Sequence, residues 1–128
     1  MRKVLLAALL ALGLSGCAAI QTLENAYQTA TTTSVSPQVI YVVVNAFDEL
    51  QNGGTVYLTS CRGHLDRPVC SAANRRLVIQ SVRKGRPIRA QLETYLQTNS
   101  PAPATLFNVL RDIVAALQTS AAAKGAVQ

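Results

Sequence analysis

The chain has 128 residues, of which 49 % are hydrophobic and 14 % are charged, and it carries a formal net charge of +6 at pH 7. A chain of this length forms one domain. Without the leader and tether described below, fewer than about 100 residues remain to build a core, and a core of that size often needs a covalent link to be stable. For a mildly basic chain with the export signal described below, nucleic acid is not expected as a partner, and anionic lipid, lipopolysaccharide or an acidic protein is favoured.

Residues 1–16 have the layout of a secretion signal peptide. Arg2 and Lys3 make its start positive, residues 4–14 are apolar, and Ser15 and Gly16 supply the small side chains that a signal protease requires. As a helix, the apolar stretch would be ~16 Å long, about half of a ~30 Å hydrocarbon core, which is too short for a membrane span. We therefore expect residues 1–16 to be a leader that is removed.

The segment Leu14-Ser15-Gly16-Cys17 resembles a lipobox, the sequence at which bacterial lipoproteins are lipidated. The resemblance implies that the Cys17 sulfur receives a diacylglyceryl group, and that cleavage then exposes an amino terminus that is acylated, for example with palmitate. Ala18 rather than Asp follows the cysteine, which in this family implies the outer membrane, with the domain facing the periplasm. The alternative is an ordinary signal peptide followed by an unrelated cysteine.

Residues 17–36 are expected to form the lipidated N-terminus and a tether. Ile20, Leu23 and Tyr27 are spaced as on one face of a short helix, and residues 29–36 are rich in Thr and Ser without a strong pattern. Fully extended, the tether reaches roughly 60 Å, enough to hold a domain clear of a membrane. The alternative is that the helical stub packs against the domain.

Hydrophobic spacing predicts a helical domain over residues 37–120. Its first helix starts at Pro37, behind the potential N-cap Ser36. Its apolar stripe alternates spacings of three and four residues and comprises Ile40, Val43, Phe47, Leu50, Gly54, Tyr57 and Cys61. A β-hairpin over residues 39–59 is the alternative, because residues 39–44 are rich in β-branched side chains and residues 52–54 suit a turn. The stripe keeps its phase through both glycines, which favours one helix, kinked or frayed near Gly53.

Two further helices complete the predicted domain. The second begins after Ser71, and its apolar face comprises Leu77, Val78, Ile88, Leu92, Tyr95 and Leu96, with Val82 at its margin. Pro87 is expected to kink or split this helix next to Gly85. After a stiff turn at residues 99–103, the third helix has an apolar face formed by Leu106, Val109, Leu110, Ile113, Val114 and Leu117. We therefore predict an all-α, three-helix, up-down-up bundle, followed by a frayed tail over residues 121–128.

Cys61 and Cys70 remain once Cys17 is assigned to lipidation. An even number of cysteines in an exported protein predicts a disulfide, here in the connection between the first two helices. The alternative is a metal site formed by both cysteines with His64 and Asp66, but the spacing matches no zinc pattern. We expect the disulfide, and neither a metal nor another cofactor.

The sequence shows no convincing catalytic set. The one histidine lies between the paired cysteines, the acidic residues are scattered, and the glycine pair at 53–54 lacks the Lys and Ser/Thr of a phosphate-binding loop. We therefore expect a non-catalytic binding or structural module. Its candidate face for an anionic partner lies on the second helix and comprises Arg75, Arg76, Arg83, Arg86 and Arg89. Arginine suits bidentate contact with phosphate, although a solvated helix face has the same composition.

The chain also resembles small lipoproteins encoded by phages and prophages of proteobacteria. The resemblance is carried by residues 14–17, by the segment at 42–48 and by Cys61 with Cys70-Ser71-Ala72-Ala73. It implies an alternative function as an envelope factor, either an outer spanin subunit in lysis or a lipoprotein that excludes superinfection. A helical domain with a disulfide differs from the short proline-rich segment that is typical of outer spanins.

Overall fold

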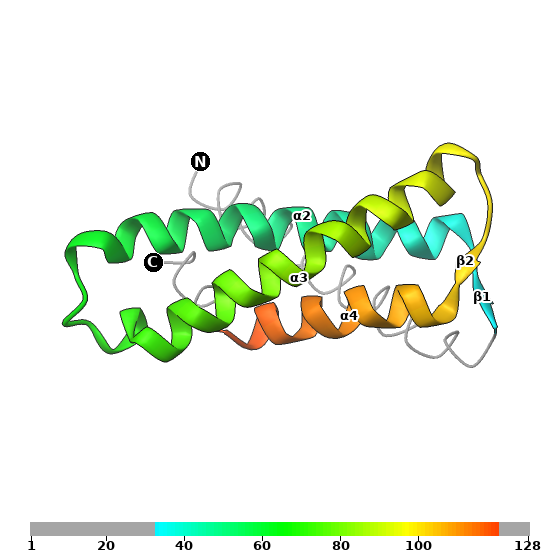
Figure 1. Ribbon diagram of the computed structural model, residues 1–128. Coiled ribbons are helices and arrows are strands. Elements are labelled where there is room, and N and C mark those ends of the chain that lie inside the picture. Colours follow the sequence, from blue (N-terminus) through cyan, green and yellow to red (C-terminus); the bar gives the residue numbers. More distant parts are fainter. Residues whose placement is uncertain (1–32, 121–128) are drawn as a thin grey trace, which may run out of the picture.

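The computed structural model describes residues 33–120, which form an all-α, three-helix bundle (Figure 1). In chain order its elements are β1 (Ser34–Val35), α2 (Pro37–Ser60), the short 3-10 helices η2 (Cys61–Gly63) and η3 (Pro68–Cys70), α3 (Ala72–Gln97), β2 (Ala102–Pro103) and α4 (Ala104–Thr119). Helices α2 and α4 run in one direction and α3 runs in the other, which confirms the up-down-up prediction. The predicted leader, Cys17, most of the tether and the tail at 121–128 lie outside the described residues.

The first helix, α2, is continuous through both of its glycines, so the hairpin alternative is wrong. Its buried residues are Ile40, Val43, Val44, Phe47, Gly54 and Tyr57, which are the predicted stripe with Val44 added and Leu50 half-buried. Gly54 suits this position because α3 passes close by: a Cβ at Gly54 would lie 3.0 Å from Cγ1 of Val78. Packing against a second helix therefore outweighs the low helix propensity of glycine.

The start of α2 differs in one detail from the prediction. Pro37 lies in the first turn as expected, but the Ser36 side chain makes no capping hydrogen bond. Instead, the Ser36 carbonyl oxygen accepts hydrogen bonds from the N–H groups of Val39 and Ile40, both at 3.1 Å. The ring of Pro37 already fixes a helical φ angle and has no N–H group to be capped. A capping side chain therefore has less to add to the stability of the helix start.

The second helix, α3, is also continuous, although Pro87 lies inside it. It begins at Ser71, whose Oγ accepts a hydrogen bond from the Asn74 N–H at 3.3 Å. Gly85 is buried where α3 packs on α2, and a Cβ there would lie 2.2 Å from Cε2 of Phe47. The predicted split next to Gly85 is therefore wrong, since α3 continues through Pro87, and Gly85 makes room for a phenyl ring of the neighbouring helix.

The predicted apolar faces of α3 and α4 are confirmed at their centres and wrong at their edges. Val78 and Leu92 on α3 are buried, as are Leu110, Val114 and Leu117 on α4. By contrast, Leu77 is 41 % exposed and Val109 is 46 % exposed. Phe107, absent from the predicted face, is fully buried and extends the α4 stripe toward its start at spacings of three and four residues.

A two-stranded antiparallel pairing joins the start of the domain to the connection between α3 and α4. Val35 pairs with Ala102, and Ser34 pairs with Pro103. Val35 and Ala102 are both buried, and the Ala104 N–H donates to the Thr33 carbonyl oxygen at 3.1 Å. The last residues of the predicted tether are therefore paired with the connection between α3 and α4.

The bundle has three helices at one end and two at the other. Helix α4 has 16 residues and α2 has 24, so their lengths are ~24 Å and ~36 Å. In Figure 1, α4 ends before the loop that joins α2 to α3. We call residues 52–84, which extend past α4, the distal arm, and residues 33–51 with 85–120 the three-helix body. None of the described helices is long and apolar enough to span a membrane.

Candidate functional site

The distal arm ends in a loop that is closed by the predicted disulfide. Cys61 and Cys70 are bonded, both are buried, and their Cα atoms lie 5.4 Å apart. The Tyr57 hydroxyl group donates a hydrogen bond to the Val69 carbonyl oxygen, and Asn74 Nδ2 donates to the same oxygen at 3.3 Å. One disulfide and two side chains, one from each helix, therefore hold this loop in place.

Arg75, the first of the five predicted arginines, also contributes to this support. Its Nε atom donates to the Cys70 carbonyl oxygen at 3.0 Å. Burial raises the pKa of the Tyr57 hydroxyl, and the positive charge of Arg75 partly opposes that rise. Tyr57 therefore remains protonated at neutral pH and keeps its proton for the bond to Val69.

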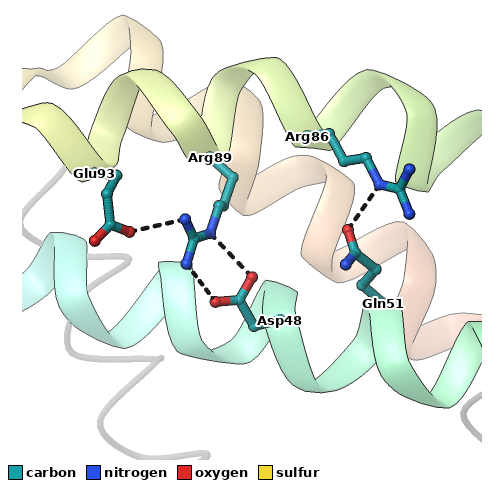
Figure 2. Close-up of polar contacts among 5 residues, drawn as sticks. All are labelled: Asp48, Gln51, Arg86, Arg89 and Glu93. Atoms are coloured by element: carbon teal, nitrogen blue, oxygen red, sulfur yellow. Dashed lines mark hydrogen bonds and ion pairs between the residues drawn. The ribbon is translucent and has the colours of Figure 1, made fainter.

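Arg89 joins α2 to α3 in the three-helix body (Figure 2). Its Nε and Nη2 atoms donate to the two carboxylate oxygens of Asp48 at 3.0 and 2.8 Å, and its Nη1 atom lies 2.9 Å from Oε2 of Glu93. The hydrogen bonds to Asp48 raise the pKa of Arg89, and the charges of both carboxylates act in the same direction against desolvation. Arg89 is therefore engaged within the fold and is not a free cation.

The five predicted arginines consequently do not form one equivalent set. Arg86 donates from Nε to Oε1 of Gln51 at 3.1 Å, so it too links α3 to α2 (Figure 2). Arg76 and Arg83 are exposed, and their side chains make no hydrogen bond or ion pair with another described residue. Within the predicted face, these two are the arginines that the described part of the chain leaves available to a partner.

Three further exposed cations lie in the distal arm and were not in the predicted set. These are Arg62 and Arg67 in the loop and Lys84 on α3. In total the arm contains six basic residues and one acidic residue, Asp66, whereas the body contains three basic and four acidic residues. The sequence itself shows this excess of positive charge, since residues 58–86 contain one acidic residue. The prediction covered one face of a helix and therefore left out the cations of the loop.

A groove of about 290 Å³ runs between α2 and α3 and is bordered by two of the predicted arginines. It starts at Gln51 and Arg86, which face each other between α2 and α3 in Figure 2, and extends from there into the arm. Its lining is mixed, with apolar Leu58, Ile79 and Val82 beside polar Thr55 and the cation Arg83. Six of its eight lining residues belong to the distal arm, whereas Gln51 and Arg86 belong to the body.

The structure also bears on the metal alternative at the loop. Both cysteines are bonded to each other, so neither supplies a thiolate ligand to accompany His64 and Asp66. Between residues 33 and 120, no group of three or more His, Cys, Asp and Glu side chains is arranged to hold a metal ion.

No protein-family model, curated protein or solved structure matches this chain. What the chain does is therefore inferred from its own residues and their geometry.

Proposed function

We propose that the chain is a lipoprotein, anchored to the outer membrane through Cys17, whose helical domain faces the periplasm as a non-catalytic binding module. The observation that carries this proposal is the apolar leader that ends in the lipobox-like residues 14–17. Several acyl chains attach a protein durably to a membrane, whereas one chain is marginal. The Cys61–Cys70 disulfide agrees with this location, because oxidising compartments preserve disulfides.

The binding role is supported by the uneven distribution of charge between the body and the arm. Arg89 in the body is neutralised by Asp48 and Glu93. In the arm, Arg62, Arg67, Arg76, Arg83 and Lys84 are exposed without a carboxylate partner among the described residues. Such unpaired cations attract phosphates and carboxylates of an envelope lipid or protein, and arginine binds these groups bidentately.

Metabolic labelling with palmitate tests the anchor. Wild type is expected to incorporate the label and to fractionate with outer membranes, whereas Cys17→Ser incorporates none. The matched control is the double variant Cys61→Ser, Cys70→Ser. It also replaces cysteines by serine, but it retains the label because Cys17, its lipidation site, is intact. Label retained by Cys17→Ser, or wild type recovered without label, would overturn the proposal.

Crosslinking in envelopes tests the binding surface. The variant Arg76→Gln, Arg83→Gln removes two positive charges from the arm, and Gln91→Glu, Gln97→Glu changes the net charge by the same amount at exposed positions of the body. We expect the arm variant to lose its crosslinked partner while the body variant keeps it, with equal helical circular dichroism. Equal recovery of the partner by both variants would contradict a binding role for the arm.

A further inference from the structure

The tip of the distal arm, defined as Cys61–Cys70, exposes apolar side chains beside cations. Leu65 is 57 % exposed and Val69 is 49 % exposed, and both belong to the same ten-residue segment as the exposed cations Arg62 and Arg67. The arm contains five of the seven large hydrophobic side chains that are exposed in residues 33–120, namely Val56, Leu65, Val69, Leu77 and Ile79. Exposed apolar side chains therefore gather in the arm more than in the body, which makes the arm the candidate interaction region.

The tip is held in a defined shape by covalent and hydrogen bonds. The disulfide closes it, and the Val69 carbonyl oxygen accepts hydrogen bonds from Tyr57 and Asn74. Little conformational entropy is therefore lost when the tip binds, which favours association.

The charge of the arm indicates which kind of surface the tip fits. Six basic residues and one acidic residue, Asp66, lie in the arm. Apolar side chains among Arg and Lys are the composition of segments that lie in the interface of anionic membranes. The combination therefore fits lipid, where phosphates meet the cations and the acyl boundary meets Leu65 and Val69.

The length of the preceding chain places such a surface within reach. From Cys17 to Ser34 the backbone spans up to ~60 Å when extended. Helix α2 is ~36 Å long, so the tip lies about that distance from the start of the domain. An anchor at Cys17 thus allows the tip to touch the membrane that holds the anchor, at a high effective concentration.

We propose that the tip docks on an anionic phospholipid surface, with Leu65 and Val69 at the level of the headgroups and Arg62 and Arg67 on phosphates. The presence of that membrane rests on the proposed function above. The domain is then attached at two points, its lipidated N-terminus and its tip, and lies along the membrane.

A single tryptophan reports the depth of the tip, because the chain has no Trp of its own. Full-length, lipidated Leu65→Trp is reconstituted into vesicles of phosphatidylcholine with or without phosphatidylglycerol, and quenching by brominated lipid is measured. The matched control is Tyr41→Trp, at a position of the body that is 59 % exposed. We expect blue-shifted, quenched emission from position 65 in phosphatidylglycerol vesicles and unquenched emission from position 41.

The variant Arg62→Gln, Arg67→Gln on the Leu65→Trp background tests the cations. Each basic residue near an anionic lipid surface strengthens binding about fivefold, so the docked-to-undocked ratio should fall roughly 25-fold. Unquenched emission from position 65, as expected for a tip that binds a protein, overturns the inference, and so does equal quenching at positions 41 and 65. A palmitate-labelled chain with an unquenched tip overturns the inference alone, whereas an unlabelled chain overturns the proposed function.

Discussion

The three-helix body and the distal arm contain the same residue types and use them differently. In the body, Arg89 is bonded to Asp48 and Glu93 and holds two helices together. In the arm, Arg76 and Arg83 belong to the same helix but contact no described carboxylate. The difference shows that a basic helix face is not one functional unit, because the residues opposite it decide which cations are available to a partner.

The two regions also differ in what stabilises them. The largest fully buried side chains of the body include Phe47, Phe107 and Leu110, which pack among three helices. Beyond the end of α4, the arm has two helices, and it relies on buried Val78 and Tyr57 together with the disulfide. A covalent link thus replaces part of the missing apolar contact at the end where the molecule is thinnest.

Removal of the disulfide should produce the largest effect on stability. Closing a loop of about ten residues contributes roughly 2.7 kcal/mol by restricting the unfolded chain. We expect the double variant Cys61→Ser, Cys70→Ser to lose about this free energy of unfolding in urea titrations. Amide exchange should accelerate more in residues 52–84 than in the body, and uniform acceleration would show that the two regions unfold as one unit.

A methyl group at Gly85 tests the contact between α2 and α3 in the body. Because the added Cβ would collide with the buried ring of Phe47, Gly85→Ala should destabilise the domain by about 1–3 kcal/mol. Gly53→Ala is the matched control, since no atom lies within 4 Å and alanine is favoured in helices by about 0.5–1 kcal/mol. Thermal unfolding measures both changes, and a stabilised Gly85→Ala would refute the close contact.

Paired substitutions of two arginines should separate stability from binding. Arg89→Gln removes a partly exposed ion pair between helices and should cost about 1 kcal/mol or less in urea unfolding, because solvent screens such pairs. Arg83→Gln should change stability by less than about 0.5 kcal/mol, as exposed substitutions do. In envelope crosslinking we expect the opposite order, because Arg83→Gln should reduce recovery of the crosslinked partner more than Arg89→Gln does. Loss of stability from Arg83→Gln would instead indicate a structural role.

The smallest predicted effect is a pH dependence from Tyr57. Because its pKa is raised in the folded state, the hydroxyl group stays protonated where the unfolded chain ionises. Its contribution is complete below the unfolded pKa of about 10 and is lost as pH rises through the folded value. Wild type should therefore lose stability more steeply than Tyr57→Phe between pH 9 and 11, as measured by urea titration. Identical slopes would contradict the raised pKa.

Hydrophobic periodicity was sufficient to predict the helices, and the number of cysteines was sufficient to predict the disulfide. The spacing of Ile40, Phe47 and Tyr57 identifies the buried face of α2, because helix geometry relates that spacing directly to one side. The cysteine pair follows from parity once Cys17 is set aside. These features depend on residues close together in the chain, and sequence reasoning resolves such local patterns best.

Features that depend on distant residues could not be predicted from one sequence. The pairing of Val35 with Ala102 joins two segments of two residues each, too short to show alternation. The sequence predicts a break at Pro87, next to Gly85. It does not reveal the contact between Gly85 and Phe47, because that contact is set by how two helices cross. The division of the arginines has the same origin, since Arg89 meets Asp48 across 41 positions of sequence.

Site-specific photocrosslinking in envelopes tests most directly whether the distal arm is the binding region. A photoreactive residue replaces Leu77 in the arm or Val109 in the body, two apolar positions of similar exposure, 41 % and 46 %. The division between arm and body predicts crosslinks to envelope lipid or protein from position 77 and none from position 109. Crosslinks from position 109 with none from position 77, or equal yields from both, would contradict it.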